Sequence, residues 1–310
     1  MRVLIGVDGS AGSFAAVHFA GRILSADEDE LILYYSPPSR TYLLEDTSGL
    51  LNEAQMYLSD AVFTKAKEHL PEPFRSKLQT VASTRRADHG ILGMSDVRLA
   101  DLIVLGARGA GRLTQPTLGS VAQHVVSHST IPVLVVRSAR PATTHGLRVL
   151  LASDGSAMCH RASDLLDQFS WPAGSTGLAL TVVEQEAQHT LPKWLTEQLD
   201  KTQLAAVGVG PRAKSEKEAM RIHKETECWY GFLPPIFQGR DPLIVPGHAA
   251  EQILEAIDTN DIDLAVVGAR RLGPIHRLFL GSTSTHIVNH APCSVLIVRD
   301  QKRTPGEVFL

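Results

Sequence analysis

The sequence predicts an α/β protein of two tandem domains, each with a doubly wound, mostly parallel sheet and helices on both faces. Short apolar runs alternate with amphipathic runs along the 310 residues, which is typical of βαβ units and a parallel sheet. The second half repeats the first, and such repetition decides the architecture. The hydrophobic content of 44% and the charged content of 20% are ordinary for a globular chain.

The internal repeat sets the domain limits. Residues 85–137 align without a gap onto residues 247–299, so that Gly106 falls on Gly268. The starts also correspond, because residues 3–10 match residues 149–156. Each half is long enough for a domain. We therefore expect a first domain over 1–140, a second domain over 147–303, a tail over 304–310 and a linker at 141–146.

The first half supplies its elements in strict alternation. Its first strand is a continuous apolar run, and the helix after it has apolar residues at helical spacing, including Phe14, Val17 and Ala20. A Pro37-Pro38 loop separates the second strand from a long amphipathic run. The expected strands are 2–7, 30–35, 78–82, 102–106 and 133–137, and the expected helices are 13–24, 52–70, 90–98 and 120–128.

The second half follows the same plan with a longer insertion. Apolar runs predict strands at 149–153, 178–183, 264–267 and 295–299. Helices are expected at 194–204 and 216–228, and residues 231–241 read as irregular. For residues 229–232 we expect core packing or a domain contact. The sequence assigns no role to the insertion at 186–241.

A glycine pattern recurs after the fourth strand of each half. In the first half it is Gly106-x2-Gly109-x9-Gly119-Ser120, placed between a buried strand and the start of an amphipathic helix. Glycines allow the backbone to come close to a ligand, and a helix start offers N–H groups and partial positive charge to a phosphate. In the alternative interpretation the glycines serve turn geometry and Ser120 caps the helix.

Three segments together give the chain a resemblance to a known family. They are the strand ending in Val7-Asp8-Gly9-Ser10, the glycine pattern, and the closing Ile131-Pro132-Val133-Leu134-Val135-Val136-Arg137. With them the sequence resembles the universal stress protein family, as a tandem member of the ATP-binding subtype. The resemblance covers nearly all of residues 1–137 and, more loosely, residues 147–299.

The resemblance implies a five-stranded parallel sheet in each domain and pairing of the domains through their last strands. An unpaired last strand would leave an exposed edge. We therefore expect 133–137 and 295–299 to pair, either within one chain or swapped across two chains of a homodimer.

We expect ATP or ADP, with Mg²⁺, to bind the first half. The glycine loop and the helix start would hold the polyphosphate, and two arginines would add charge-assisted contacts. Asp8 would accept the ribose hydroxyls, and the resemblance implies that the backbone near Ser36 reads adenine. The expected binding residues are Asp8, Ser36, Gly106, Arg108, Gly109, Gly111, Arg112, Gly119, Ser120 and Val121.

The second half departs from this pattern, because Arg271 stands where the first half has Gly109. An arginine there either blocks the close backbone approach or places its guanidinium in the phosphate position. A possible second site comprises Asp154, Gly268, Arg271, Gly273, Gly281 and Ser282. The principal site is expected in the first half.

Histidines recur four residues apart, at 124 and 128 and again at 286 and 290. This spacing suits two metal ligands on one helical face, but no carboxylate or cysteine repeats with them. His128 and His290 also fall at a predicted helix C-terminus, where histidine bonds carbonyls. We favour that interpretation and expect no metal ligands from protein side chains. Cys293 reads as a core residue.

Two function classes remain open. One is a binding module, an ATP-loaded regulatory protein of the stress response. The other is an enzyme, a slow ATPase or a nucleotide-dependent transferase, for which the chain lacks a P-loop and a water-positioning group. We favour binding, with at most weak ATP hydrolysis.

Charge and hydropathy limit the partners. The net charge of −3 gives no nucleic-acid footprint, and no apolar run approaches the roughly 20 residues of a membrane span. We therefore expect no nucleic-acid or membrane partner. Three unclustered cysteines favour a cytoplasmic location.

Overall fold

The computed structural model describes residues 1–37, 48–109, 118–137, 146–154, 158–184, 224, 226–227, 229–269 and 280–299. Its strands are β1 (Arg2–Val7), β2 (Glu30–Tyr35), β3 (Gln79–Ala82), β4 (Leu102–Gly106), β5 (Val133–Val136), β6 (Arg148–Ser153), β7 (Thr176–Glu184), β8 (Leu243–Gly247), β9 (Leu264–Ala269) and β10 (Ser294–Arg299). Its helices are α1 (Ala11–Ile23), α2 (Ser48–Glu68), α3 (Glu72–Arg75), α4 (Ala87–Val97), α5 (Ser120–His128), α6 (Met158–Asp167), α10 (Ala249–Thr259) and α11 (Ser282–His290), with the 3-10 helix η1 (Pro235–Phe237).

The strands of both halves join one ten-stranded sheet in the order β3-β2-β1-β4-β5-β10-β9-β6-β7-β8. Neighbouring strands within each half are parallel. At the centre β5 pairs antiparallel with β10, with Val135 opposite Val295 and Leu134 opposite Leu296. The predicted fold class is confirmed, and the final strands pair within one chain.

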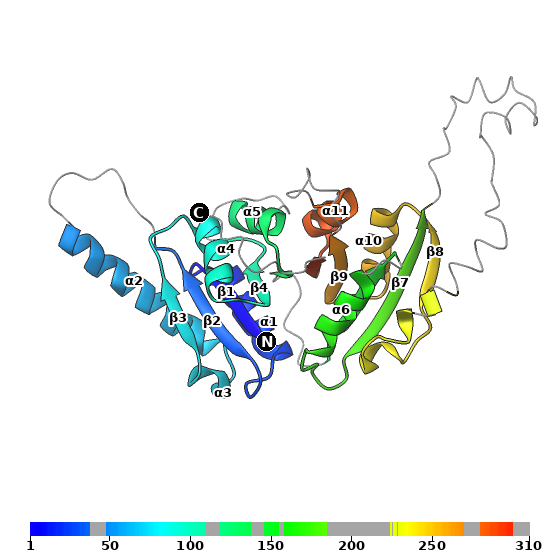
Figure 1. The fold of residues 1–310 in the computed structure, drawn as a ribbon, viewed down its shortest axis with the longest axis horizontal. Coiled ribbons are helices and arrows are strands. Elements are labelled where there is room, and N and C mark those ends of the chain that lie inside the picture. Colours follow the sequence, from blue (N-terminus) through cyan, green and yellow to red (C-terminus); the bar gives the residue numbers. More distant parts are fainter. Residues whose placement is uncertain are drawn as a thin grey trace, which may run out of the picture.

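The sheet is covered by helices on both faces because its strands are apolar on both faces. Along β1, Val3 and Ile5 belong to one core, to which α1, α2 and α6 contribute, whereas Leu4 belongs to the other. That second core takes residues from α4, α5, α10 and α11. Each core includes residues from both halves, and the two halves lie side by side in Figure 1.

Two arginines, the half-buried Arg137 and the buried Arg299, form reciprocal hydrogen bonds across the junction. Arg137, just after β5, donates from Nη2 to the carbonyl of Val288 at 2.7 Å, near the end of α11. Arg299, at the end of β10, donates from Nη2 to the carbonyl of Val126 in α5. The last carbonyls of a helix lack partners within it, and a charged donor satisfies them strongly. Each half therefore completes a helix of the other.

A repeated aspartate has a similar structural explanation. Asp101 and Asp263 precede β4 and β9, and each accepts the backbone N–H of a strand's first residue. Asp101 Oδ2 lies 2.7 Å from the amide nitrogen of Arg2, and Asp263 Oδ2 lies 2.8 Å from that of Arg148. These bonds fix the start of β1 beside β4 and the start of β6 beside β9.

Strand β8 and helices α3, α6 and α10 are absent from the sequence prediction. Strand β8 has the sequence LIVPG, with mostly half-buried or exposed residues, and it lies at an outer edge of the sheet. An edge strand tolerates a proline. A proline in a short run argues against a strand when only the sequence is known, so residues 243–247 were not predicted as one. The segment at 231–241, expected to be irregular, contains η1. The expected helices at 194–204 and 216–228 and the linker at 141–146 lie wholly or largely outside the described residues.

Other structural expectations are confirmed. Trp229 is buried in the core, and the hydroxyl of Tyr230 donates to the carbonyl of Phe237 at 2.5 Å, so these two residues pack into the second half, whereas Phe232 is exposed. Cys293 is also buried. In the last turns of α5 and α11, the Nδ1 atoms of His128 and His290 each lie 2.8 Å from the carbonyl oxygen one turn earlier.

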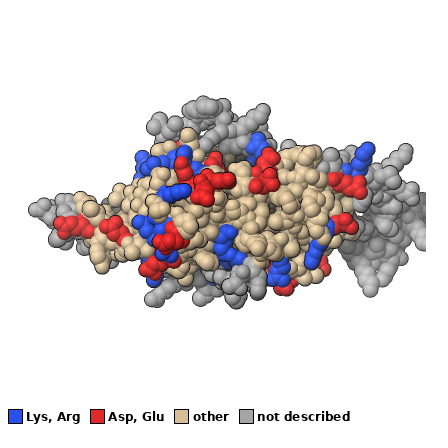
Figure 2. Space-filling view, turned by 90° about the horizontal axis from the view of Figure 1, so that it is seen from below, with Lys and Arg blue, Asp and Glu red and all other residues tan. Residues whose placement is uncertain are grey.

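The surface matches the small net charge. On the face shown in Figure 2, acidic and basic side chains are interspersed. Among the described residues, none of the helices combines the length and apolarity needed to cross a bilayer.

The reciprocal arginines generate a stability prediction. Arg299→Met should lower the free energy of unfolding by about 1–3 kcal/mol, because the buried carbonyl of Val126 loses a charged donor. Arg137→Met should have a similar effect. Chemical denaturation of the full chain measures both changes.

Lys65→Met is a suitable control because Lys65 is exposed. Within the described part of the chain, its side chain forms a hydrogen bond and ion pair with Glu68 only. Surface pairs contribute about 0–1 kcal/mol. An Arg299→Met protein no less stable than this control would show that the crossing bonds contribute nothing.

Candidate functional site

A cavity of about 270 Å³ opens at the carboxyl ends of β1 and β4. The chain continues from β1 to β2 on one side, whereas β4 and β5 lie on the other, so this is the topological switch point of the first half. Ligands of open α/β sheets bind at such points. The lining residues are Gly6, Val7, Asp8, Ser13, Tyr34, Ser36, Ala87, Ile91, Leu105, Gly106, Ala107, Arg108, Gly109, Gly119, Ser120, Val121 and Ala122.

The structure brings most of the predicted binding residues together around this cavity. The lining contains Asp8 and Ser36, from the ends of β1 and β2, with the predicted residues Gly106, Arg108, Gly109, Gly119, Ser120 and Val121. Gly111 and Arg112 lie outside the described residues. Residues separated by more than 80 positions in the sequence, such as Asp8 and Gly109, are therefore neighbours in the fold.

Asp8 is held in place by the turn that follows β1. Its Oδ1 atom accepts hydrogen bonds from the amide of Ser10 at 3.0 Å and from the Ser10 hydroxyl at 2.6 Å. The intervening Gly9 has φ of +81°, a conformation that favours glycine. Burial and then the charge of Asp8 raise the pKa of the adjacent Tyr35. The turn therefore fixes the orientation of the Asp8 carboxylate at the edge of the cavity.

The glycines at the site make room for other protein atoms. A Cβ atom at Gly109 would lie 2.2 Å from Oδ2 of Asp8, and one at Gly106 would lie 2.6 Å from the backbone oxygen of Gly12. Gly12 in turn approaches the carbonyl of Arg108, where a Cβ would lie 2.4 Å away. The loop after β4 thus packs directly against the start of α1 and against Asp8.

The start of α5 faces the same cavity. Its N-cap residue is Gly119, without a side-chain capping bond, whereas α1 is capped by the hydroxyl of Ser10. Ser120 is the first helical residue, so the alternative in which Ser120 caps this helix is wrong. The first N–H groups of a helix have no partners within it. The N–H groups of Ser120 and Val121 belong to the first turn of the helix and lie beside the cavity. They are therefore placed to donate hydrogen bonds to a bound anion.

Tyr34 is a cavity residue that the sequence analysis missed. Its side chain is only 1% exposed, and its hydroxyl has no hydrogen-bond partner within the described structure. An unsatisfied buried hydroxyl is costly, and a polar ligand atom would satisfy it. The signal in the sequence is weak, because a tyrosine within an apolar strand reads as core. Nearby, the Ser36 hydroxyl donates to the carbonyl of Arg85 at 2.5 Å and ties β2 to the loop before α4.

The second half differs at several corresponding positions. Strand register places Ala152 where the first half has cavity-lining Gly6, and Leu180 where it has Tyr34. Two residues after Leu180, the second half has Val182 where the first half has Ser36. At α11, Gly281 is again the N-cap before Ser282, and the Ser284 hydroxyl donates to the carbonyl of Gly268 at 2.6 Å. Asp154 is exposed, and Arg271 and Gly273 lie outside the described residues.

Comparison with known proteins gives a consistent result. The sequence model of the Universal stress protein family matches residues 1–137 and 238–299, more than half of the chain. A universal stress protein of Mycolicibacterium smegmatis is 25% identical over 312 residues, covering 96% of each chain. One from Thermus aquaticus is 34% identical over 151 residues, covering 49% of this chain and 97% of its own length. The crystal structure of a universal stress protein from Archaeoglobus fulgidus has the same fold, with a TM-score of 0.60, 18% identity and 96% coverage of both chains.

The close packing of Gly90 against the Tyr34 hydroxyl leads to a prediction about stability. A Cβ at Gly90 in α4 would lie 1.8 Å from the Tyr34 hydroxyl. Gly90→Ala should destabilise the protein by about 1–3 kcal/mol, as overpacking does, despite the better helix propensity of alanine. Thermal or chemical unfolding measures the change.

Gly93 provides the matched control in the same helix, because the nearest atom to its added Cβ is 3.7 Å away, on Arg85. Gly93→Ala should raise stability by up to about 1 kcal/mol. Equal stabilisation by both substitutions would show that Tyr34 does not fill the space beside Gly90.

Proposed function

Because the chain belongs to the universal stress protein family, we propose that it is an ATP-binding regulatory protein whose principal nucleotide site is the cavity of the first half. One observation carries this proposal. An oriented carboxylate, a glycine loop and an uncapped helix start converge on one cavity at the switch point of the sheet. These groups match the hydroxyls and phosphates of a nucleotide.

The residues present fit ATP or ADP. The volume of about 270 Å³ lies just below the roughly 300–1,000 Å³ usual for ligand pockets. Asp8 would accept ribose hydroxyls, and the N–H groups of Ser120 and Val121 would bind phosphate oxygens. Arg108, which is exposed, would add charge. Mg²⁺ would be held by the phosphates, without a ligand from the protein.

The base would lie between the end of β2 and helix α4. The backbone at Ser36 would read the adenine edge, and Ile91 supplies an apolar surface in the lining. The orphaned hydroxyl of Tyr34 would bond a polar atom of the base or sugar. This bond would relieve the cost of its burial, which supports a polar ligand over an apolar one.

The same geometry favours binding over catalysis. Asp8 is the acidic residue in the described cavity lining, and its Oδ1 atom already accepts two bonds from Ser10. Hydrolysis requires a group that positions the attacking water. In the described lining, Asp8 is the carboxylate that could position a water molecule. Asp8 is better placed to accept the ribose hydroxyls. The nucleotide would therefore act as a signal that the protein carries.

We propose only one principal site per chain. The second half has Ala152, Leu180 and Val182 where the first half has Gly6, Tyr34 and Ser36, and its sequence has Arg271 where the first half has Gly109. Leu180 and Val182 lack the hydroxyl groups of Tyr34 and Ser36, and Ala152 adds a side chain where Gly6 has none. The division into domains at 1–140 and 147–303 also remains a proposal, to be tested by expression of each half.

Gly109→Arg tests the site directly. The added side chain would collide with the Asp8 carboxylate, displacing the group that holds the ribose. Loss of a charge-assisted bond of about 1.5–3 kcal/mol should weaken ATP binding roughly 10- to 150-fold. Isothermal titration calorimetry with MgATP measures the effect.

Gly239→Arg is the control, because a Cβ there meets no atom within 4 Å and the substitution adds the same charge. It should leave ATP affinity unchanged. Unaltered affinity in Gly109→Arg would place the nucleotide elsewhere.

The asymmetry of the halves predicts a stoichiometry of one nucleotide per chain. Equilibrium dialysis of the wild-type protein measures it, with Arg271→Gly as the companion variant. The variant should also bind one nucleotide, because the differences at Ala152, Leu180 and Val182 remain. A wild-type stoichiometry near two would disprove the assignment of a single site.

A further inference from the structure

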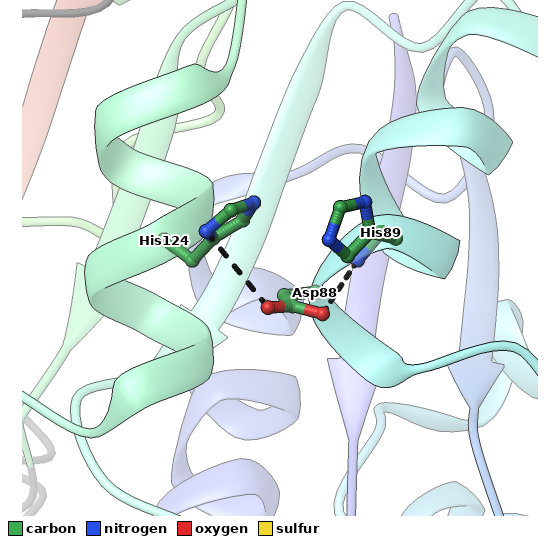
Figure 3. Close-up of side chains that lie close together, drawn as sticks. All are labelled: Asp88, His89 and His124. Atoms are coloured by element: carbon green, nitrogen blue, oxygen red, sulfur yellow. Dashed lines mark hydrogen bonds and ion pairs between the residues drawn. The ribbon is translucent and has the colours of Figure 1, made fainter. Parts of the chain in front are cut away.

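Three ligand-forming side chains meet beside the cavity, between α4 and α5. Asp88 and His89 belong to the first turn of α4, and His124 lies one turn into α5. One ligand atom from each residue lies within 4.8 Å of the other two, and His124 Nδ1 is 3.9 Å from Asp88 Oδ2. Figure 3 shows the two rings on either side of the carboxylate, turned toward the space between the helices.

From this geometry we infer that Asp88, His89 and His124 form a binding site for a divalent transition metal, with Zn²⁺ as the best chemical match. Two imidazoles and one carboxylate are a donor set that Zn²⁺ accepts, leaving a fourth position for water. Zinc ligands in a tetrahedral site lie about 3.4 Å apart for bond lengths near 2.1 Å. The exposed His89 ring can close the remaining distance by side-chain rotation.

The neighbours of Asp88 and His124 act on both side chains. The hydrogen bond from Arg86 is the main reason that the pKa of Asp88 falls to about 2. Burial, followed by the neighbouring His128, lowers the pKa of His124. The His128 ring also stacks on His124 with centroids 3.9 Å apart, which restricts the orientation of the ligand ring.

Arg86 holds the carboxylate in the metal-free protein. Its Nε atom lies 2.8 Å from Asp88 Oδ1, and its Nη2 atom pairs with Oδ2 at 2.5 Å. The Arg86 side chain is 72% exposed, so it can swing into solvent when a metal binds. Arg86 is thus a competitor for the carboxylate, and its removal should strengthen metal binding.

The second half contains a natural control. His286 and His290 repeat the spacing of His124 and His128, and their rings stack with centroids 4.2 Å apart. The repeat, however, places Ala250 and Glu251 where the first half has Asp88 and His89. A histidine pair on one helix is therefore present twice, whereas the three-ligand arrangement is found in the described part of the first half only.

Calorimetric titration of the full, nucleotide-free chain with Zn²⁺ tests the inference. The wild-type protein should bind one Zn²⁺ tightly, and Asp88→Ala and His124→Ala should each weaken binding at least about tenfold. His286→Ala, the matched substitution in the second half, should leave the affinity unchanged. Equal losses in His124→Ala and His286→Ala, or no loss in Asp88→Ala, would overturn the site.

Arg86→Ala guards against loss of binding through misfolding. Removal of a nearby positive charge should tighten Zn²⁺ binding on the order of tenfold, a gain that a disrupted fold cannot produce. Replacing Zn²⁺ by Co²⁺ should give visible ligand-field absorption that disappears in His124→Ala. Weaker Zn²⁺ binding in Arg86→Ala, or Co²⁺ spectra unaffected by His124→Ala, would contradict the proposed ligands.

Discussion

The antiparallel pairing of β5 with β10 is the contact on which the rest of the structure depends. It closes two apolar strand edges at once and turns ten strands into one sheet with a continuous core on each face. Arg299 then reaches across the junction to α5, the helix whose first turn lines the cavity. The position of the helix that begins at the cavity is therefore set partly by the other half of the chain.

The sequence predicted those parts of the fold that rest on local pattern. Buried parallel strands are uniformly apolar, so β1, β4 and β9 were visible, and the repeat located their partners. Strand β8 was missed because an edge strand with Pro246 lacks that pattern. The site was predictable where a motif marks it, as at Asp8 and Gly109. Tyr34 and Asp88 carry no such mark, because their significance comes from neighbours on other elements.

The glycine pattern illustrates how one motif serves two physical requirements. From sequence alone, Gly106 and Gly109 were interpreted as points where a backbone approaches a ligand. In the fold their missing side chains first admit the start of α1 and the carboxylate of Asp8. This close packing places the Asp8 carboxylate, the loop after β4 and the start of α5 next to one another. A ligand-binding role and a packing role are therefore compatible, and the second is a condition for the first.

The covalent link between the halves has an evolutionary consequence. In a symmetric dimer of identical subunits, every substitution appears on both sides of the twofold axis. In this chain Arg137 and Arg299 preserve the exchange across the junction, while Gly6 and Ala152 occupy equivalent positions without being identical. Tethering also keeps the halves together at any protein concentration. One half can thus lose or change its pocket under mutation while the other retains its own, which a homodimer could not achieve.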